Sequence, residues 1–406
     1  MLKKIEISQL QTGMFVDKVD APWFQHSLWK TRFLIDDRET LTRVRTCGAK
    51  AVWIDVSQGK DIGAPVAPVK PAAATAMVAP AVESKPVVRR SMGDELQTAS
   101  DIIKRSKEAV VSLFSEARMG NAIDTSQCEP LVNDIVGSVD RNGDALISLC
   151  RLKMADEYTY MHSVSVCALM VSLGRQLGLD ETTCRNAGMA GLLHDLGKAA
   201  IPNEILNKPG KLTDDEFGVV KSHPVKGYET LIASGVDNEH VLDVCRHHHE
   251  KMDGSGYPDR LNSESISMIA RMSAVCDVYD AITSNRPYKA GWDPAESVSR
   301  MASWQGHFDP VVLQTFIKTI GIYPTGSLVR MASGKLGVVV EQNAAKLTAP
   351  KVKLFYSTKS NMPLVPPKLV NLMESHVNDK IVARESHESW NFNANYLNDL
   401  WATHVP

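Results

Sequence analysis

The chain has 406 residues, a length that indicates two or three domains of about 100–200 residues each. Hydrophobic residues make up 44% and charged residues 23%, the usage of an ordinary soluble protein, which excludes a long disordered or collagen-like chain. The formal net charge of −2 argues against a general nucleic-acid binder, because such proteins rely on a strong basic field.

The seven cysteines include no CxxC pair, so we expect neither a disulfide framework nor a Cys-ligated zinc knuckle. The N-terminal segment MLKKIEISQLQTGMF has two lysines but no continuous apolar stretch, which argues against a signal peptide. No segment approaches the ~18 uninterrupted apolar residues of a membrane-spanning helix. These features favour a cytoplasmic protein without a membrane span.

The first 92 residues predict a small domain followed by a linker. Residues 1–58 predict a β-rich domain, because Ile5 and Ile7 alternate with polar residues and residues 51–54 form a short apolar run. Residues 59–92 are built from Pro, Ala and Val without a period, a composition that predicts an extended linker.

Residues 93–118 predict an amphipathic helix, because apolar side chains recur at steps of three and four residues. The apolar stripe fits either packing within its own domain or a homodimer seam. Polar Ser106 falls inside the stripe and fewer than four heptads are present, which favours packing within the domain. The stripe consists of Leu96, Ala99, Ile103, Val110, Leu113 and Ala117.

The chain from about 124 to 320 is expected to be nearly all helix, as part of one helical domain at 93–323. Ser263 can cap a long helix there, and Thr213 with Glu216 forms a plausible capping box. Apolar runs between turn residues predict a β-rich appendage at 324–385, followed by a tail at 386–406. The predicted fold class is therefore mainly α, with small β-rich parts at both ends.

Histidine is concentrated in the middle of the chain. Seven of the 12 histidines lie within residues 162–249. Histidine is the commonest metal ligand and a frequent proton-transfer group, so this clustering indicates a site in the predicted helical domain.

The segment LLHDLGK, residues 192–198, closes an apolar helix, and Gly197 is placed to end that helix in the left-handed conformation. His194 and Asp195 would then lie in the last turn and lean toward one point. A histidine with a carboxylate suits a divalent transition metal. Two such residues alone would by default be a capping or solvated pair.

The segment HHHEKMDGSGYP, residues 247–258, combines three histidines with a glycine-rich loop. Three consecutive histidines are costly in a core, because each needs polar partners when buried. The backbone amides of residues 253–258 could close over an anion. The alternative is a simple turn after a polar helix end.

The segment AVCDVYDAITSNRPYK, residues 274–289, places Asp277 and Asp280 on one helix face. Acidic residues on an apolar face are costly unless they are paired or bound to metal. Arg286 and Lys289 follow, and two cations beside an acidic cluster suit a phosphate held against metal ions. For Asp280, a structural Asp–Arg pair is the simpler interpretation.

Together these segments resemble the HD-GYP family, a branch of the HD metal-dependent phosphohydrolases, over residues 125–325. The HD pair is His194-Asp195, and GYP is Gly256-Tyr257-Pro258 within HHExxDGxGYP. The RPYK segment and the GHFDP segment at 306–310 are also similar to this family. The resemblance implies an all-helical HD-type core that holds metal ions and acts on cyclic dinucleotides, chiefly cyclic di-GMP. The N-terminal domain resembles an uncharacterised module often found before HD-GYP domains.

The resemblance also assigns metal ligands residue by residue. His247 and His240 match no ligand position of the family. One ligand set would hold the first ion and another the second, with the Asp195 carboxylate bridging both. The first set is His162, His194, Asp195 and Asp277, and the second is Asp195, His223, His248 and His249.

One departure from the family limits the number of metals. Members with three metals carry a glutamate four residues before the histidine matched by His162, where this chain has Tyr158. Glu157 is one residue off and would point about 100° away on a helix. The resemblance therefore implies two divalent ions, with iron or manganese as the family expectation. A donor set of histidines and two carboxylates suits such first-row ions.

The resemblance implies contacts to the substrate as well. Lys198 matches a family lysine directed at the substrate phosphate, and Arg286 with Lys289 matches the family's basic pair. Gly256, Tyr257 and Pro258 would shape the mouth of the pocket. Asp195 and Lys198 are the residues expected to take part in catalysis.

The resulting hypothesis is metal-assisted hydrolysis of cyclic di-GMP to linear pGpG, with further cleavage to GMP left open. Two alternatives remain. Other HD proteins cleave different nucleotides, although they generally lack the GYP loop and the HHE histidines. A receptor with slow turnover that binds cyclic di-GMP and signals through partners is the other alternative.

Overall fold

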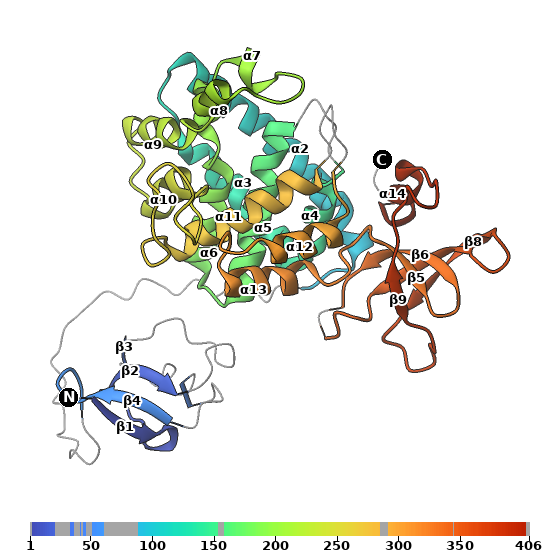
Figure 1. The fold of residues 1–406 in the computed structure, drawn as a ribbon, viewed down its shortest axis with the longest axis horizontal. Coiled ribbons are helices and arrows are strands. Elements are labelled where there is room, and N and C mark those ends of the chain that lie inside the picture. The colour runs from blue at the N-terminus through green and yellow to red at the C-terminus, as the bar shows by residue number, and fades with distance from the viewer. Residues whose placement is uncertain are drawn as a thin grey trace. The chain divides into compact units, whose positions relative to one another are not determined.

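The computed structural model describes residues 2–20, 33–35, 41, 44–45, 51–60, 88–152, 158–284, 291–343 and 345–402 (Figure 1). The chain divides into two compact units, residues 1–83 and 84–406. Most of the predicted linker lies outside the described residues, as do Arg286 and Lys289.

The N-terminal unit contains a four-stranded antiparallel sheet in the order β1-β4-β2-β3. Its hydrophobic core includes Ile5, Val16, Val52 and Ile54, which are fully or almost fully buried. The predicted β-rich domain is therefore confirmed. The strands are β1 (Leu2–Glu6), β2 (Phe15–Asp20), β3 (Phe33–Leu34) and β4 (Ala51–Asp55).

The predicted helix at 93–118 is confirmed as α2 (Met92–Met119). Ser91 begins it by accepting a hydrogen bond from the Asp94 amide, and Gly120 ends it in the left-handed conformation at φ 77°. The apolar stripe packs into the hydrophobic core of the chain's own helical part. A homodimer through this helix therefore stays a prediction.

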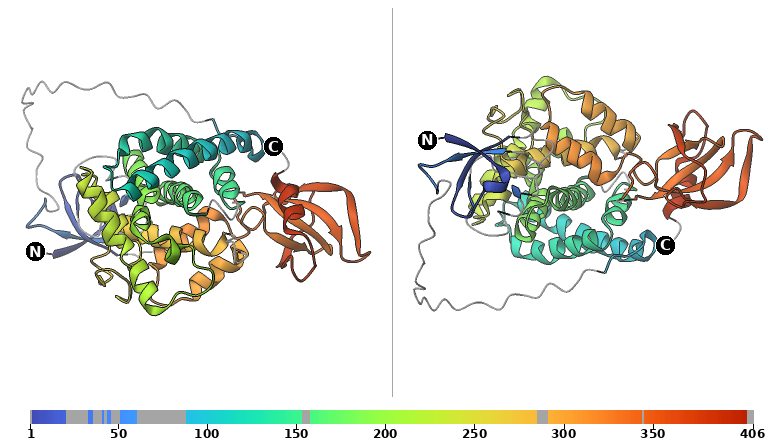
Figure 2. Two further views of the ribbon diagram at one scale, coloured as in Figure 1. Left: turned by 90° about the horizontal axis from the view of Figure 1, so that it is seen from above. Right: turned by 90° about the horizontal axis from the view of Figure 1, so that it is seen from below.

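Helix α5 lies inside the helical core, and its residues are buried without interruption from Met161 to Val171. Figure 2 shows from above and below that other helices enclose this part of the chain. A helix that is apolar on every side belongs in such an interior position. Glycines let α6 approach α5, because a Cβ on Gly188 would lie 2.7 Å from Cγ2 of Val171.

The core helices follow in chain order after α2. They are α3 (Cys128–Arg141), α4 (Gly143–Cys150), α5 (Tyr158–Leu177), α6 (Glu181–Leu193), α7 (Asn203–Leu206), α8 (Asp214–Val220), α9 (His223–Ala233), α10 (Glu239–His247), α11 (Met268–Thr283), α12 (Pro294–Ser303) and α13 (Pro310–Ile320).

The predicted capping box of Thr213 and Glu216 is confirmed at the start of α8. The predicted start of α11 was wrong, because Ser267 rather than Ser263 caps this helix by accepting from the Ala270 amide. The Arg271 guanidinium donates to the carbonyl oxygens of Ile266 and Ser263 and so holds the preceding turns outside the helix.

The C-terminal module, residues 324–402, is a five-stranded antiparallel sheet in the order β8-β7-β6-β5-β9, with α14 (Ala394–Ala402) against β6. Arg151 of the helical core donates to the Thr325 carbonyl at 2.8 Å and ties the module to the core. The predicted class, mainly α with β-rich parts at both ends, is confirmed. The strands are β5 (Leu328–Met331), β6 (Lys335–Glu341), β7 (Lys351–Ser357), β8 (Met362–Asn371) and β9 (Ile381–Arg384).

None of the helices among the described residues combines the length and the apolar content needed to cross a membrane.

Candidate metal centre

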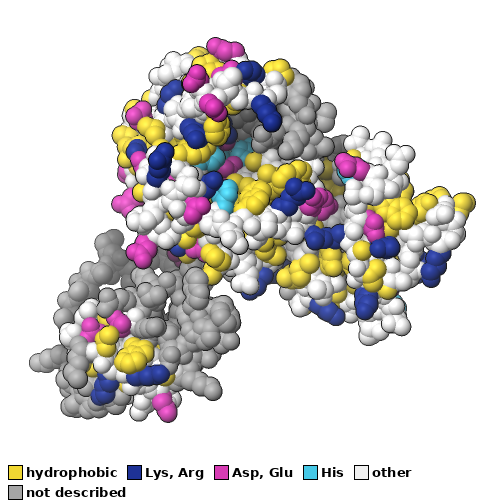
Figure 3. Space-filling model, viewed as in Figure 1, with side chains coloured by type: hydrophobic (Ala, Val, Ile, Leu, Met, Phe, Trp, Pro, Cys, Tyr) yellow, Lys and Arg dark blue, Asp and Glu magenta, His cyan; other side chains and the backbone are white. Residues whose placement is uncertain are grey.

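The residues predicted as metal ligands come together in the helical core from several elements. His162 lies on α5, the HD pair follows α6, His223 begins α9, His248 and His249 follow α10, and Asp277 lies on α11. All are buried except His249, which is half-buried. Histidine side chains are visible at the surface of the helical core in Figure 3. Residues far apart in sequence thus form one cluster of imidazoles and carboxylates.

The Asp195 carboxylate lies between two groups of histidines. Its Oδ2 is 3.5 Å from Nε2 of His162 and 3.4 Å from Nε2 of His194. Its Oδ1 is 3.3 Å from Nε2 of His223 and 3.8 Å from Nε2 of His248. Each oxygen therefore faces one group, which is the position that a carboxylate shared by two cations needs.

Asp277 supplies the second carboxylate. Its Oδ1 is 3.0 Å from Nε2 of His162 and 3.8 Å from Nε2 of His194, and its Oδ2 is 3.7 Å from Nδ1 of His249. His162, His194 and Asp277 form one group whose donor atoms lie within 4.8 Å of one another. His223, His248 and His249 form a second such group.

Backbone and carboxylate acceptors fix how the imidazoles point. When Nδ1 donates its proton to an oxygen, the neutral ring presents the lone pair of Nε2, the form in which histidine ligates metal. Four rings of the cluster are held in this way. The Nδ1 atoms lie 2.7 Å from Asp280 Oδ2 for His162, 2.7 Å from the Gly191 oxygen for His194, 2.8 Å from the Val220 oxygen for His223 and 3.0 Å from the Val244 oxygen for His248.

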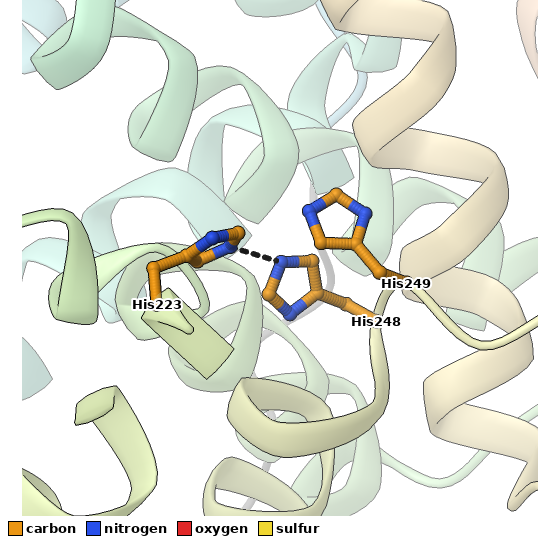
Figure 4. Close-up of side chains that lie close together, drawn as sticks. All are labelled: His223, His248 and His249. Atoms are coloured by element: carbon orange, nitrogen blue, oxygen red, sulfur yellow. Dashed lines mark hydrogen bonds between the residues drawn. The ribbon is translucent and has the colours of Figure 1, made fainter. Parts of the chain in front are cut away.

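The resulting lone pairs face one another and fit a bound cation. Nε2 of His223 is 3.2 Å from Nε2 of His248 (Figure 4). With both Nδ1 atoms protonated, neither neutral ring has a proton to place between these two nitrogens. Among the described residues, His194 Nε2 and Asp195 Oδ1 are buried without a hydrogen-bond partner. A divalent metal would satisfy all of these atoms, so the donor set fits the ion that the fold implies.

Electrostatics keep most of the cluster in the protonation state that metal binding requires. Burial opposes ionisation of Asp195, but Lys198 and His194 outweigh it and hold its pKa well below the usual range. Burial together with the charge of neighbouring imidazoles keeps the pKa of His248 well below normal. Burial also lowers the pKa of His249 to about 3, against the opposing charge of Asp277. These carboxylate and imidazole groups are thus available as ligands.

The pKa of His162 is shifted in the opposite direction to those of His248 and His249. Burial lowers its pKa, but hydrogen bonds with Asp277 and Asp280 outweigh burial and raise the pKa to about 9. A metal at this nitrogen has to displace that proton. Asp280 also accepts a hydrogen bond from Ser165. The interpretation of Asp280 as half of a structural Asp–Arg pair missed this contact with the centre, which joins residues 118 positions apart.

The structural role of Gly197 differs from the predicted one, which was to end a helix in the left-handed conformation. Gly197 lies within the 3-10 helix Leu196–Ala200 that follows the HD pair, not in the left-handed conformation. A Cβ at this position would overlap the His223 carbonyl and lie 2.5 Å from the Gly227 nitrogen. The glycine is needed because the HD turn meets the start of α9 backbone to backbone, and this contact brings the two histidine groups together.

The GYP loop folds back over the HHE segment. Gly256 is buried, and a Cβ there would lie 2.5 Å from the Glu250 Cα. The Tyr257 ring packs on His249 at 4.7 Å between centroids. The Glu250 carboxylate, 3% exposed, accepts hydrogen bonds from the amides of residues 259–261 at 2.7, 2.9 and 3.1 Å. Sequence reasoning gave Glu250 no role, although it anchors the end of this loop.

His247 lies outside the cluster, and both of its ring nitrogens face other carboxylates. Its Nδ1 is 2.7 Å from Asp243 Oδ1 and its Nε2 is 3.1 Å from Asp259 Oδ2. Arg246 also donates to Asp259. The extra histidine of the HHH run therefore connects α10 to the end of the GYP loop.

Two lysines lie near the cluster. The Lys198 ammonium contacts Asp195 Oδ2, and its side chain remains 22% exposed. Lys221, which sequence reasoning did not select, lies over two aromatic rings, with its Nζ 4.7 Å from the Phe217 centroid and 5.5 Å from the Tyr257 centroid. Its sequence signal was its position two residues before His223.

Comparison with known proteins agrees with this geometry. The chain is 51% identical to the cyclic di-GMP phosphodiesterase PA4108 of Pseudomonas aeruginosa, over 99% of this chain and 96% of that protein. The chain belongs to the HD-GYP family. Within this HD-GYP protein, a profile of the HD domain matches residues 145–312, and a profile of a domain of unknown function, DUF3391, matches residues 2–128.

Two other proteins match a smaller share of the chain. The response regulator RpfG of Xanthomonas campestris, a cyclic di-GMP phosphodiesterase, is 42% identical over 42% of this chain and 47% of its own length. The solved structure of Bd1817, a HDG"Y"P protein from Bdellovibrio bacteriovorus, superposes with a TM-score of 0.47 and 16% identity. That superposition covers 78% of this chain and 98% of the other.

Proposed function

We propose that this protein is a metal-dependent phosphodiesterase that hydrolyses cyclic di-GMP in the cytoplasm. The buried cluster of five histidines and two aspartates carries the proposal, because its lone pairs converge and its carboxylates stay ionised. The nearly full-length similarity to PA4108, a cyclic di-GMP phosphodiesterase, supports the substrate.

The proposed metal content is two divalent ions, iron or manganese. His162, His194 and Asp277 would hold one ion, His223, His248 and His249 the other, and Asp195 would serve both. When bound, such ions supply Lewis acidity, which makes water nucleophilic near neutral pH and offsets charge on a phosphoryl group. The ionised carboxylates of Asp195 and Asp277 and the neutral imidazoles of His248 and His249 keep the binding pocket ready for that charge.

The chain's own cations would position the substrate. Lys198 lies at the edge of the cluster with part of its side chain exposed, so its ammonium can turn from Asp195 to a phosphate oxygen. We propose Arg286 and Lys289 as further phosphate contacts, and Gly256, Tyr257 and Pro258 as the loop that bounds the pocket. The proposed product is linear pGpG, which a second hydrolysis at the same site would convert to GMP.

A double substitution tests the proposal. His194→Ala with Asp195→Ala removes a donor of the first group and the carboxylate that faces both groups, so bound metal and hydrolysis should be lost together. The matched control is Glu374→Ala with His376→Ala, an exposed carboxylate–histidine pair at 3.3 Å in the C-terminal module, which should keep both. Metal analysis and chromatographic identification of the nucleotide products give the readouts. Wild-type turnover by the metal-free double variant would refute the proposal.

A further inference from the structure

The hairpin of β7 and β8, residues 351–371, has an unusual charge composition. It carries four lysines and no Asp or Glu, although the whole chain has a net charge of −2. Lys351 is paired with Glu341 at 2.9 Å. Lys359 and Lys368 are exposed, and no carboxylate of the described residues lies within ion-pair distance of either. The hairpin therefore presents uncompensated positive charge.

The same hairpin exposes large aliphatic side chains. Met362 is 59% exposed, Val365 86% and Leu369 58%. All three lie on β8, an edge strand of the sheet, on the side of the module away from the helical core (Figure 1). Hydrophobic and basic side chains gather on this module in Figure 3. Exposed apolar groups next to uncompensated charge mark an interaction surface.

The strand does not suit pairing with another strand. Pro363, Pro366 and Pro367 remove three amide donors from an element of ten residues. A partner strand would therefore meet an interrupted ladder, a common way of protecting sheet edges. The partner must accordingly be bound by the side chains of β8.

The residue types distinguish between kinds of partner. Protein interfaces are enriched in arginine and aromatic residues and depleted in lysine. Single-stranded nucleic acids are bound by aromatic side chains that stack on bases. The exposed residues are here lysines and aliphatic side chains. Lysines beside anionic headgroups, with aliphatic groups in the acyl boundary, are the combination that binds a lipid surface.

We propose that the β8 edge, defined as Lys359, Met362, Val365, Lys368 and Leu369, docks the protein reversibly on an anionic membrane surface. The docking is peripheral, in line with the absence of a membrane-spanning helix among the described residues. It would bring the C-terminal module, and the helical core tied to it by Arg151, to the lipid surface.

Co-sedimentation of the full-length protein with vesicles tests the proposal. One vesicle set contains phosphatidylcholine alone, and the other contains phosphatidylcholine with phosphatidylglycerol. Binding is expected only to the anionic set and should weaken as salt is raised. Since each lysine near an anionic surface changes the partition coefficient about fivefold, Lys359→Gln with Lys368→Gln should lower it roughly 25-fold.

Two matched variants make the result specific. Lys346→Gln with Lys380→Gln removes two exposed lysines elsewhere in the module and should change the partition coefficient less. Val365→Ser should weaken binding, whereas Val382→Ser on β9, where the valine is 52% exposed, should not. Hydrolysis in solution should be unchanged in all variants, which verifies that they fold.

Equal partition into neutral and anionic vesicles would overturn the proposal. Equal losses from the two lysine pairs would also overturn it, because the effect would then follow total charge. The proposal would also be overturned if the β8 edge bound an acidic protein but the full-length protein bound no vesicle. These outcomes concern the module alone, so they leave the proposed hydrolysis untouched.

Discussion

The contact between Asp280 and His162 leads to a sharp prediction for metal binding. Asp280 is 1% exposed and accepts hydrogen bonds from His162 Nδ1 and from Ser165. The Ser284 hydroxyl donates to the same carboxylate at 3.4 Å. In Asp280→Asn the side chain keeps its size but has one acceptor oxygen for these three donors. If the amide group turns toward His162, the ring must place its proton on Nε2, the nitrogen that faces Asp277.

The magnitude follows from the type of bond that is lost. A hydrogen bond to a charged group contributes about 1.5–3 kcal/mol, which corresponds to roughly 10- to 150-fold in an equilibrium constant. Replacing an outer carboxylate that orients a ligating histidine typically costs about 10–100-fold in metal affinity. We therefore expect Asp280→Asn to raise the metal Kd by about 10–100-fold, with activity partly restored at high metal concentration.

Titration calorimetry with Mn²⁺, on protein first stripped by a chelator, measures this change directly. Asp243→Asn is a matched control. Asp243 accepts hydrogen bonds from His247 Nδ1 and from Ser267, the same arrangement around a histidine outside the cluster. It should leave the metal Kd nearly unchanged. An unaltered Kd in a well-folded Asp280→Asn protein, or an equal loss in Asp243→Asn, would refute the reasoning.

Three further predictions rest on single residues. In Glu250→Gln the side-chain NH2 group would face at least one of the three backbone N–H groups that the carboxylate now accepts from. We therefore expect the free energy of unfolding, measured by chemical denaturation, to fall by about 1–3 kcal/mol, with lower activity at full metal content. A variant as stable as wild type would contradict the loop-anchoring role. Lys221→Gln should raise the KM for cyclic di-GMP roughly tenfold with little change in kcat, because it removes a cation beside Tyr257. An unchanged KM in steady-state assays would exclude this contact. Burial is the main cause that raises the pKa of Asp144 to about 7, so its stabilising contribution is full below about pH 4 and is lost as the pH rises through 7. Thermal unfolding should therefore show Asp144→Asn gaining on wild type from about pH 4 to pH 7 and keeping that gain at higher pH, by at most about 4 kcal/mol. The opposite trend with pH would disprove it.

The sequence predicted helices well where interactions between neighbouring residues determine their bounds. The periodic stripe from Leu96 to Ala117 gave α2 almost to the residue, and the box of Thr213 and Glu216 formed as expected. The tail after residue 386 was left unassigned, although Leu397, Leu400 and Trp401 have helical spacing and pack as one face of α14. A short helix whose stability comes from packing is easily missed in sequence.

The misplaced details depend on contacts that are distant in sequence. Ser263 and Ser267 are equally good caps by local rules, and the side chain of Arg271 decides between them. Asp280 and Glu250 looked unremarkable because their partners become apparent only once the helices are packed. The HD and HHE motifs identified the candidate ligands through resemblance to a family. The orientation of each imidazole required the carbonyls and the carboxylate that the fold places behind it.

The backbone contact at Gly197 has a consequence for the choice of metal. The HD turn and the start of α9 touch main chain to main chain, and a Cβ on Gly227 would in turn lie 2.7 Å from Cys245 Sγ. The separation of the two ligand-bearing segments is thus limited by van der Waals contact between two main chains and cannot adjust by a change of rotamer. Ions of different radius would meet the same spacing of ligand-bearing segments, so we expect their affinities to differ with ionic size. Selectivity among metals would then be altered by adding volume at this contact, even with every ligand left in place.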